Sequence, residues 1–190
     1  MVDQRIKYAA GAVAVVAVLL VARRARAAEK FVPDDSAGRV GRWRPLAEKY
    51  GNAAGVPVDW ILATIAQESG GDPQAGNFTG GDAARGGARG LMQMTLRTAR
   101  GLGFEGDPDE LFDPETNIRL GVMLLKDGLR RHGAMADSSC AYNSGKPCAR
   151  APEFTTTHYL PGVQAKRANF AGVGFAAVGR LQMSSRRHIA

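Results

Sequence analysis

Apolar side chains recur at intervals of three and four residues through the middle of the chain, which is the spacing of one buried helical face. The first such stripe ends at Gly51 and Gly55, and Pro57 then suits the first turn of a second helix. A further short helix is expected over residues 92–102. The stripes behind the first two helices are Trp43, Leu46, Ala47 and Tyr50, then Val58, Ile61 and Ile65.

The clearest predicted helix begins after Asp113. The Asp113 carboxylate can accept a hydrogen bond from the free amides of a first turn, and Pro114 fits the first helical position. Another helix is expected from about Ser138 or Ser139. Residues 71–90 are rich in glycine and predict a long loop, and no alternation of apolar and polar residues is long enough to predict a sheet. The pattern predicts an all-α domain whose strongest stripe is Ile118, Val122, Leu125 and Leu129.

The N-terminal segment has a different pattern. Every residue from 8 to 22 is apolar or glycine, with Lys or Arg on both flanks. A membrane span needs about 20 residues, but flanking basic side chains extend the usable length. We therefore expect residues 1–28 to form an N-terminal transmembrane helix that contacts lipid through residues 6–22. A cleaved signal peptide is the alternative, since Ala25-Arg26-Ala27 resembles a cleavage site. Residues 29–41 are expected to be a linker.

The distribution of charge limits the choice of partner. The formal net charge is +7, but residues 1–30 contribute +4, residues 166–190 contribute +5, and residues 31–165 contribute −2. Basic ends are typical of contact with a membrane surface or a protein partner. No basic patch is interleaved with aromatic residues, so nucleic acid is not an expected partner. The basic, apolar tail of residues 166–190 is expected either to lie on lipid or to pack as a last helix against the domain.

Glu68 is the strongest candidate for acid–base chemistry. It follows Ile65 by three residues on the apolar side of its helix, in the last turn. Burial and the negative end of the helix dipole both disfavour the ionised carboxylate, so the pKa of Glu68 is expected to be raised, as a general acid requires. From the pattern alone, a helix-end glutamate that simply reaches solvent is the alternative.

Four short motifs occur in a fixed order from this residue onward. Glu68-Ser69 precedes the glycine-rich loop, which leads to Gly90-Leu91-Met92-Gln93. The last two motifs are Asp113-Pro114 with Asn117-Ile118 and Gly121, and then Ala141-Tyr142-Asn143-Ser144-Gly145. This order resembles the SLT-type lytic transglycosylases, a family related in fold to goose-type lysozyme. The resemblance covers about residues 42–165 and implies a lysozyme-like helical catalytic domain.

The resemblance also implies roles for individual side chains. Glu68 matches the family's catalytic glutamate, and the Tyr142 hydroxyl is expected to orient it. Gln93 is expected to hydrogen-bond the sugar and Asn143 to help hold it, while Tyr159 matches a tyrosine that follows a Glu/Thr-rich turn. The expected substrate-binding residues are Ser69, Gly90, Gln93, Tyr142, Asn143 and Tyr159.

The reaction implied by the resemblance needs one carboxyl group. Glu68 would protonate the glycosidic oxygen between N-acetylmuramic acid and N-acetylglucosamine in peptidoglycan, and the substrate's acetamido group would stabilise the oxocarbenium-like centre. The ionised Glu68 would then take the proton of the muramic C6 hydroxyl, which closes a 1,6-anhydro ring. No cofactor is needed, and the three histidines lack the spacing of zinc ligands. The alternatives are a lysozyme-type hydrolase, which usually needs a second carboxylate, and a catalytically idle wall-binding or structural component.

The segment after Glu68 departs from the family pattern. The loop carries an extra glycine-rich stretch at residues 76–87, and Thr95-Leu96 stands where the family commonly has a proline, so the cleft shape is not fixed by the resemblance.

Cys140 and Cys148 bracket the Ala-Tyr-Asn motif. They can form a disulfide that stiffens this loop in an oxidising compartment such as the periplasm. Two reduced thiols are the alternative.

The setting of the domain remains a choice between two arrangements. Basic residues are more numerous after the apolar segment than before it, so the positive-inside rule alone leaves the domain in the cytoplasm. A substrate in the cell wall requires either translocation of the whole domain to face the periplasm, or a virion membrane. A tethered domain of this size suits local opening of the wall, with virion or secretion-system proteins as partners.

Overall fold

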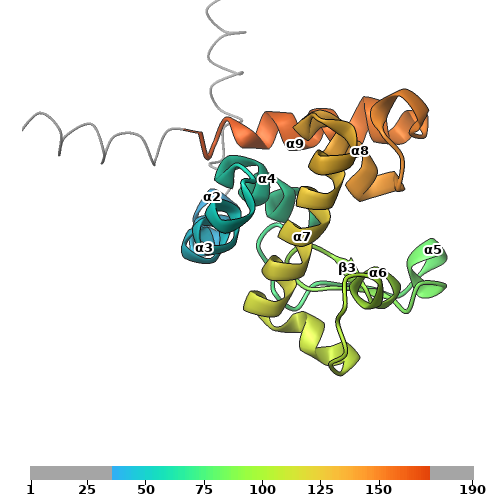
Figure 1. The fold of residues 1–190 in the computed structure, drawn as a ribbon. Coiled ribbons are helices and arrows are strands. Elements are labelled where there is room, and N and C mark those ends of the chain that lie inside the picture. Colours follow the sequence, from blue (N-terminus) through green and yellow to red (C-terminus); the bar gives the residue numbers. More distant parts are fainter. Residues whose placement is uncertain (1–35, 172–190) are drawn as a thin grey trace, which may run out of the picture. The chain divides into compact units, whose positions relative to one another are not determined.

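The computed structural model describes residues 36–171 of the chain (Figure 1). This part is mostly helical, as the sequence predicts. Its helices are α2 (Ser36–Gly41), α3 (Arg44–Ala54), α4 (Val58–Glu68), α5 (Gly80–Ala83), α6 (Leu96–Gly101), α7 (Pro114–His132), α8 (Met135–Ser144) and α9 (Leu160–Arg167). Short helical turns are η1 (Pro108–Phe112), η2 (Cys148–Arg150) and the π-helical segment η3 (Thr155–Tyr159).

Helix α4 lies at the centre of the core. Seven consecutive residues, 60–66, are buried, because α4 packs against α2, α3 and α9 on different sides. At its first turn, both Nε and Nη2 of Arg167 donate to Asp59 Oδ2, at 2.8 and 2.5 Å, and the guanidinium lies over the Trp60 ring. Burial on every side fixes the direction of α4, and with it the position of Glu68 at the C-terminal end.

Helix α7 forms as predicted. The Asp113 side chain accepts a 2.8 Å hydrogen bond from the amide of Thr116, and Pro114 occupies the first helical position. Ile118, Val122 and Leu125 are buried. In Figure 1, α7 lies between α3 on one side and the β3–α6 segment on the other, in agreement with its contacts. Helix α7 therefore connects α3 with the β3–α6 segment through the core.

The glycine-rich region contains more structure than the predicted long loop. Strands β1 (Gly76–Asn77), β2 (Ala88–Arg89) and β3 (Met94–Thr95) form a small antiparallel sheet in the order β1-β2-β3, and α5 lies between β1 and β2. The expectation of no sheet was wrong for this segment, because strands of two residues are too short to show alternation. The predicted helix over residues 92–102 begins only at Leu96, where the Thr95 hydroxyl caps α6.

The two boundaries of the domain differ from expectation. Residues 36–41, predicted as the end of a linker, form α2, and Val40 is fully buried in the core. At the other end, α9 continues into the predicted tail, and Phe170 is buried. No helix within residues 36–171 is long and apolar enough to cross a membrane. The expected anchor at residues 6–22 lies outside the described residues.

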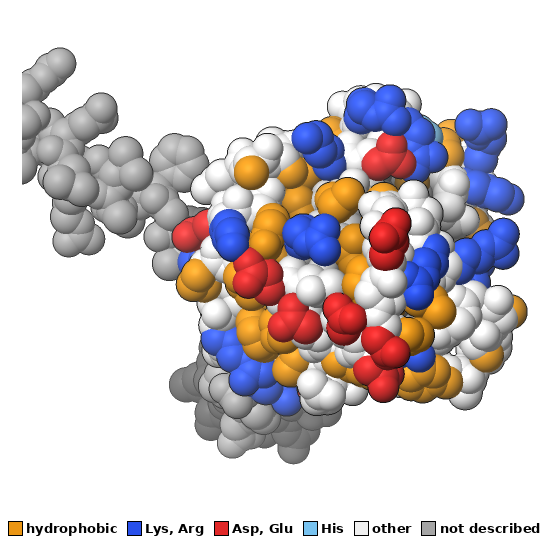
Figure 2. Space-filling view, turned by 60° about the horizontal axis from the view of Figure 1, so that its bottom comes forward, with side chains coloured by type: hydrophobic (Ala, Val, Ile, Leu, Met, Phe, Trp, Pro, Cys, Tyr) orange, Lys and Arg blue, Asp and Glu red, His pale blue; other side chains and the backbone are white. Residues whose placement is uncertain are grey.

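The surface carries charges of both signs. The face shown in Figure 2 has Lys and Arg side chains interspersed with Asp and Glu. This mixture agrees with the net charge of −2 for residues 31–165. On that face the charges do not form a continuous basic surface of the kind that binds a phosphate backbone.

Candidate active site

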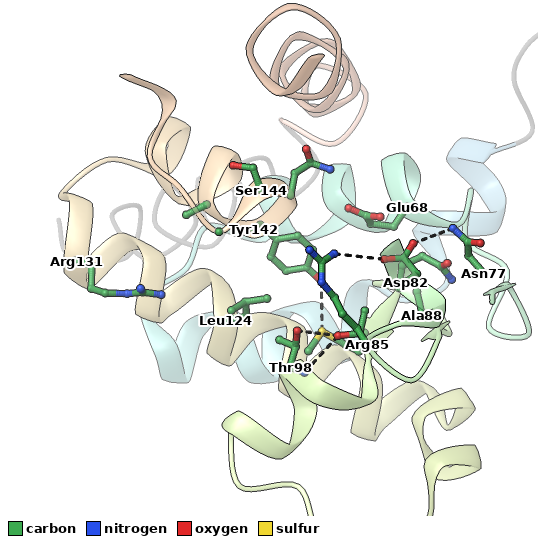
Figure 3. Close-up of a pocket in the computed structure, with 16 residues that line it drawn as sticks. Glu68, Asn77, Asp82, Arg85, Ala88, Thr98, Leu124, Arg131, Tyr142 and Ser144 are labelled. Carbon is green, nitrogen blue, oxygen red and sulfur yellow. Dashed lines mark hydrogen bonds and ion pairs between the residues drawn. The ribbon is translucent and has the colours of Figure 1, made fainter. Parts of the chain in front are cut away.

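A cleft of about 470 Å³ lies at the C-terminal end of α4 (Figure 3). Five parts of the chain form its walls: the end of α4, the β1–α5–β2 segment, β3 with α6, one side of α7, and the C-terminal half of α8. Polar side chains dominate this surface. The lining residues are Glu68, Asn77, Asp82, Arg85, Ala88, Gln93, Met94, Thr95, Thr98, Leu124, Arg131 and residues 141–145.

Glu68 is the only glutamate in the lining, and its side chain is partly buried. Burial raises the pKa of its carboxyl to about 7, and the negative charge of Asp82 adds to this effect. A hydrogen bond from Tyr159 acts in the opposite direction by stabilising the carboxylate. At neutral pH the group is therefore present in both forms, which suits a residue that must give and later take a proton. The direction and main cause of the shift are those predicted from the sequence.

Two tyrosines lie near this carboxyl but have different partners. The Tyr159 hydroxyl donates a 2.5 Å hydrogen bond to Oε1 of Glu68, while the Tyr142 hydroxyl donates a 2.6 Å bond to the carbonyl of Met92. Burial, with the charge of Glu68, raises the pKa of both phenols. The hydroxyl in hydrogen-bond contact with Glu68 is therefore that of Tyr159 and not, as expected from the motif, that of Tyr142. Tyr159 belongs to the π-helical segment η3, a conformation that is frequent at functional sites.

Gln93 lines the cleft on a strained turn. Its φ of +46° makes it the only non-glycine residue with positive φ in the described part of the chain. The side-chain Nε2 donates to the carbonyls of Ala75, at 3.0 Å, and Gly90, at 2.9 Å. These bonds hold the amide plane in place, so an expected hydrogen bond to the sugar would use the Gln93 carbonyl oxygen.

Gly90 lies beneath the cleft rather than in its lining. Its φ is +73°, and a Cβ atom there would come within 2.5 Å of the Leu111 carbonyl and 2.6 Å of Asn117 Nδ2. The fully buried Asn117 side chain accepts from the amide of Met92, at 2.7 Å, and donates to the carbonyls of Leu111, at 2.7 Å, and Arg89, at 2.8 Å. Asn117 thus fixes the backbone that leads to Gln93. The sequence placed Asn117 in a motif but gave it no role.

Ser69 and Asn143 differ in their access to substrate. The Ser69 hydroxyl donates to the Leu91 carbonyl at 2.8 Å and is not part of the cleft lining, so it connects α4 to the Gln93 turn. The expected contact between Ser69 and substrate has no support in this arrangement. Asn143 is exposed in the cleft, and its Oδ1 accepts a 2.8 Å bond from the Thr155 hydroxyl.

The β1–α5–β2 segment contributes a second carboxylate that the sequence analysis did not predict. Asp82 Oδ2 accepts a 2.8 Å hydrogen bond from Asn77 Nδ2, and its Oδ1 lies 3.7 Å from Arg85 Nη1. Figure 3 shows this group on the same side of the cleft as Glu68. No motif marks Asp82, because its position depends on how a glycine-rich loop folds over the cleft.

Cys140 and Cys148 are bonded to each other in the structure. Cys140 is fully buried on α8, and the amide of Cys148 donates to Asp137 Oδ1 at 2.9 Å. The bridge closes the loop that carries Tyr142 and Asn143. Within residues 36–171, no three His, Cys, Asp or Glu side chains gather as metal ligands.

The fold and the site together define a class of protein: a helical domain in which one glutamate with a raised pKa opens into a polar cleft. The sequence profile of the family described as Transglycosylase SLT domain matches residues 45–157, which is more than half of the chain. The chain belongs to this family. The resemblance based on the four motifs is thereby confirmed.

Curated relatives agree with this assignment. The endo-type membrane-bound lytic murein transglycosylase A of Citrobacter koseri is 38% identical over 105 residues, which are 52% of this chain and 47% of the relative. The protein of the same name from Cronobacter sakazakii is 36% identical over 110 residues, or 54% of this chain and 50% of the relative. The chain thus spans about half the length of the curated relatives it matches.

Solved structures support the lysozyme-like helical fold. The 70 kDa soluble lytic transglycosylase from Escherichia coli aligns with a TM-score of 0.55 and 25% identity, over 67% of this chain and 24% of that chain. A structure of the 70 kDa soluble lytic transglycosylase in complex with bulgecin A aligns with a TM-score of 0.55 and 24% identity, over the same share of each chain. The second likeness concerns the fold alone.

Proposed function

We propose that this chain cleaves the glycan strands of peptidoglycan as a lytic transglycosylase, with Glu68 as its acid and base. One observation carries the proposal: the Glu68 carboxyl, with its pKa raised to about 7, faces a polar cleft and is held by Tyr159. The names of the curated relatives support the same activity.

In the first step, protonated Glu68 gives its proton to the glycosidic oxygen as the bond to muramic C1 breaks. The substrate's acetamido group stabilises the oxocarbenium-like centre. In the second step, ionised Glu68 takes the proton of the muramic C6 hydroxyl, and O6 bonds to C1 to close the 1,6-anhydro ring. The hydrogen bond from Tyr159 stabilises the carboxylate between the two steps. No water is consumed, and Glu68 ends in the form in which it began.

The cleft walls carry amide side chains that suit a sugar bearing an acetamido group. Gln93 and Asn143 both line the cleft and offer amide groups, from the turn before β3 and from α8. The Tyr142 hydroxyl holds the Met92 carbonyl, next to Gln93, through its hydrogen bond. The backbone of this wall is held in place by three residues outside the cleft lining, Gly90, Ser69 and Asn117. Their contribution to substrate binding is therefore indirect.

A lysozyme-type hydrolase of the same bond is the second candidate. The presence of Asp82 in the cleft favours it, because hydrolysis without a covalent intermediate uses a second carboxylate to activate water. Asp82 is engaged by Asn77 and Arg85, and the Gly76–Asn77 strand anchors the segment that carries it. The two candidates predict different products from the same acid, Glu68.

The setting proposed for this reaction is a membrane surface that faces the cell wall. Residues 6–22 would anchor the domain in lipid, and the relatives named above are described as membrane-bound. Local wall opening by a phage virion that carries its own membrane, or by a trans-envelope machine, would suit a tethered domain, with virion or secretion-system proteins as partners. A catalytically idle wall-binding role would not need the Glu68–Tyr159 pair.

The test is mass spectrometry of the muropeptides released from purified peptidoglycan by the detergent-solubilised full chain. Wild type, Glu68→Gln and Glu105→Gln are compared, because Glu105 is an exposed glutamate outside the cleft. Anhydromuramic ends from wild type and Glu105→Gln, but not from Glu68→Gln, would support the transglycosylase. Reducing ends, one water heavier, would support the hydrolase. No release by any of the three would leave the idle role.

A further inference from the structure

Four charged side chains line the cleft, and three of them have either a proposed catalytic role or an ion-pair partner within the cleft. Glu68 is the proposed acid, while Asp82 and Arg85 lie 3.7 Å apart as an ion pair within the cleft (Figure 3). The fourth is Arg131. In Figure 3 its side chain lies at the end of the cleft away from Asp82. Arg131 is therefore the cation of the cleft that has no acidic partner among the lining residues.

The acid that Arg131 does contact lies outside the cleft and is shared. Asp127, one turn earlier on α7, contacts Arg131 and also accepts a 2.9 Å hydrogen bond from Arg130. One carboxylate thus faces two guanidinium groups, so positive charge remains at this end of the cleft. The Arg131 side chain is 47% exposed, which leaves its donors open to a ligand. Arg130 does not line the cleft.

Arg131 lies away from Glu68 along the cleft (Figure 3). It lies seven residues after Leu124, the other lining residue of α7. Seven residues are two helical turns, or about 10 Å at about 1.5 Å per residue. The two side chains therefore share one face of α7. A group bound by Arg131 would belong to a sugar at some distance from the bond that breaks, or to a substituent of that sugar.

The proposed substrate carries negative charge on every second sugar. N-acetylglucosamine is neutral, whereas muramic acid bears a lactyl ether whose carboxyl is either free or joined to a peptide with carboxylates of its own. A guanidinium presents planar paired donors that match a carboxylate. We propose that Arg131 binds a carboxylate carried by a muramic residue and so sets the register of the alternating strand in the cleft. This inference rests on the proposed function.

With this contact, the cleft would bind glycan strands that carry a carboxylate more tightly than neutral glycans. If the strand slides by one sugar, a neutral residue replaces the acidic one opposite Arg131, and the charge-assisted bond is lost. Such a bond contributes enough to change affinity roughly 10- to 100-fold. Because Arg131 is half exposed, the preference should weaken as salt increases.

The test measures binding separately from turnover. Binding is measured by calorimetry with the full chain carrying Glu68→Gln, so that no ligand is consumed. Three ligands are used: glycan strands with peptide stems, the same strands after enzymatic removal of the stems, and neutral N-acetylchitooligosaccharides of equal length. Each is tested with Arg131→Gln, Arg131→Lys and the matched control Arg130→Gln, which shares Asp127 but lies outside the cleft.

For Arg131→Gln we expect the affinity for an acidic ligand to fall roughly 10- to 100-fold, and for Arg131→Lys we expect part of that affinity to return. Arg130→Gln should bind all three ligands like its parent. A loss confined to stem-bearing strands assigns the carboxylate to the peptide, and one confined to stripped strands assigns it to the lactyl group. An equal loss on the neutral ligand, or no loss on either acidic ligand, overturns the proposal. Failure of the proposed function would appear separately, as absence of cleavage by the wild type.

Discussion

The Tyr159 hydroxyl lies 2.5 Å from Oε1 of Glu68, although the two residues are 91 positions apart in the chain. Tyr159 is almost fully buried, so this hydrogen bond is formed away from bulk water. The bond favours the carboxylate, whereas burial favours the acid. The balance of the two sets the pKa of Glu68 near neutrality, and changing either one should shift it in a known direction.

Replacing Tyr159 with Phe removes the hydroxyl and leaves the ring. The pKa of Glu68 should then rise above about 7, because desolvation is no longer opposed. We expect the alkaline limb of the kcat/KM profile to shift to higher pH. The rate should fall about 10-fold or more, since the carboxylate formed in the first step loses its donor. Activity on solubilised glycan strands between pH 4 and pH 10 measures both effects.

Tyr142→Phe is the matched control for that experiment. The Tyr142 hydroxyl donates to the Met92 carbonyl rather than to Glu68, so its loss should leave the alkaline limb in place. The effect expected instead is a higher KM from a looser cleft wall. Identical pH profiles for the two variants would contradict the assignment of the orienting role to Tyr159.

Glu68→Gln should stabilise the folded chain at alkaline pH. The unfolded chain loses this proton near pH 4.5, while the folded chain holds it to about pH 7, so stability falls as pH rises through that window. At about 1.4 kcal/mol per pKa unit, the penalty above pH 7 is up to about 3 kcal/mol. The glutamine variant avoids it. Melting temperatures should differ by several degrees at pH 8 and converge at pH 4.

Glu105→Gln again provides the comparison, since it removes an exposed carboxyl. Its melting temperature should follow that of the wild type at both pH values. A Glu68→Gln variant that melts at or below the wild type at pH 8 would show that the buried carboxylate has no such cost.

Gly90→Ala should destabilise the domain by several kcal/mol. Its Cβ atom would lie 2.5 Å from the Leu111 carbonyl and 2.6 Å from Asn117 Nδ2, both held by hydrogen bonds in the interior. Gly103→Ala separates this clash from backbone strain, because Gly103 also has positive φ, at +85°, but nothing lies within 4 Å of its Cβ position. It should cost only about 1 kcal/mol. Urea denaturation compares the two, and equal losses would exclude the close contact as the cause.

Removing the Cys140–Cys148 bridge should lower stability and weaken substrate binding. The half-cystines are eight positions apart, and a loop of that size contributes roughly 2–3 kcal/mol through the entropy of the unfolded chain. We expect a lower melting temperature and a higher KM for the double substitution to Ala, since the loop carries Tyr142 and Asn143. Reduction of the wild type with dithiothreitol should reproduce both changes, and a reduced protein that melts like the oxidised one would contradict the prediction.

The sequence was informative where local chemistry decides the structure. The Asp113 cap and the stripe from Ile118 predicted α7, and the apolar face that ends in Glu68 predicted the direction of its pKa shift. It failed where a contact depends on distant packing. The motif predicts Tyr142 as the hydrogen-bond partner of Glu68. The packing of α9 against α4 instead brings Tyr159 to the carboxyl.

The same limit explains the residues that were missed. Asp82 reaches the cleft only because three strands of two residues fold the glycine-rich segment back on itself. Arg131 reads as one of several charges in the last turn of α7, and only the packing of α7 against α8 brings it to the cleft. Neither position has a local pattern that distinguishes it from an exposed surface charge.

The distance in sequence between Glu68 and Tyr159 also sets the order in which the site is completed during synthesis. A ribosome delivers the chain from the N-terminus, so Glu68, Gln93 and Tyr142 emerge before the segment that holds Tyr159. Until η3 and α9 have emerged and docked, the carboxyl lacks the hydrogen bond from the Tyr159 hydroxyl. A nascent chain that ends before η3 would therefore lack the hydrogen bond that opposes the effect of burial on the pKa of Glu68.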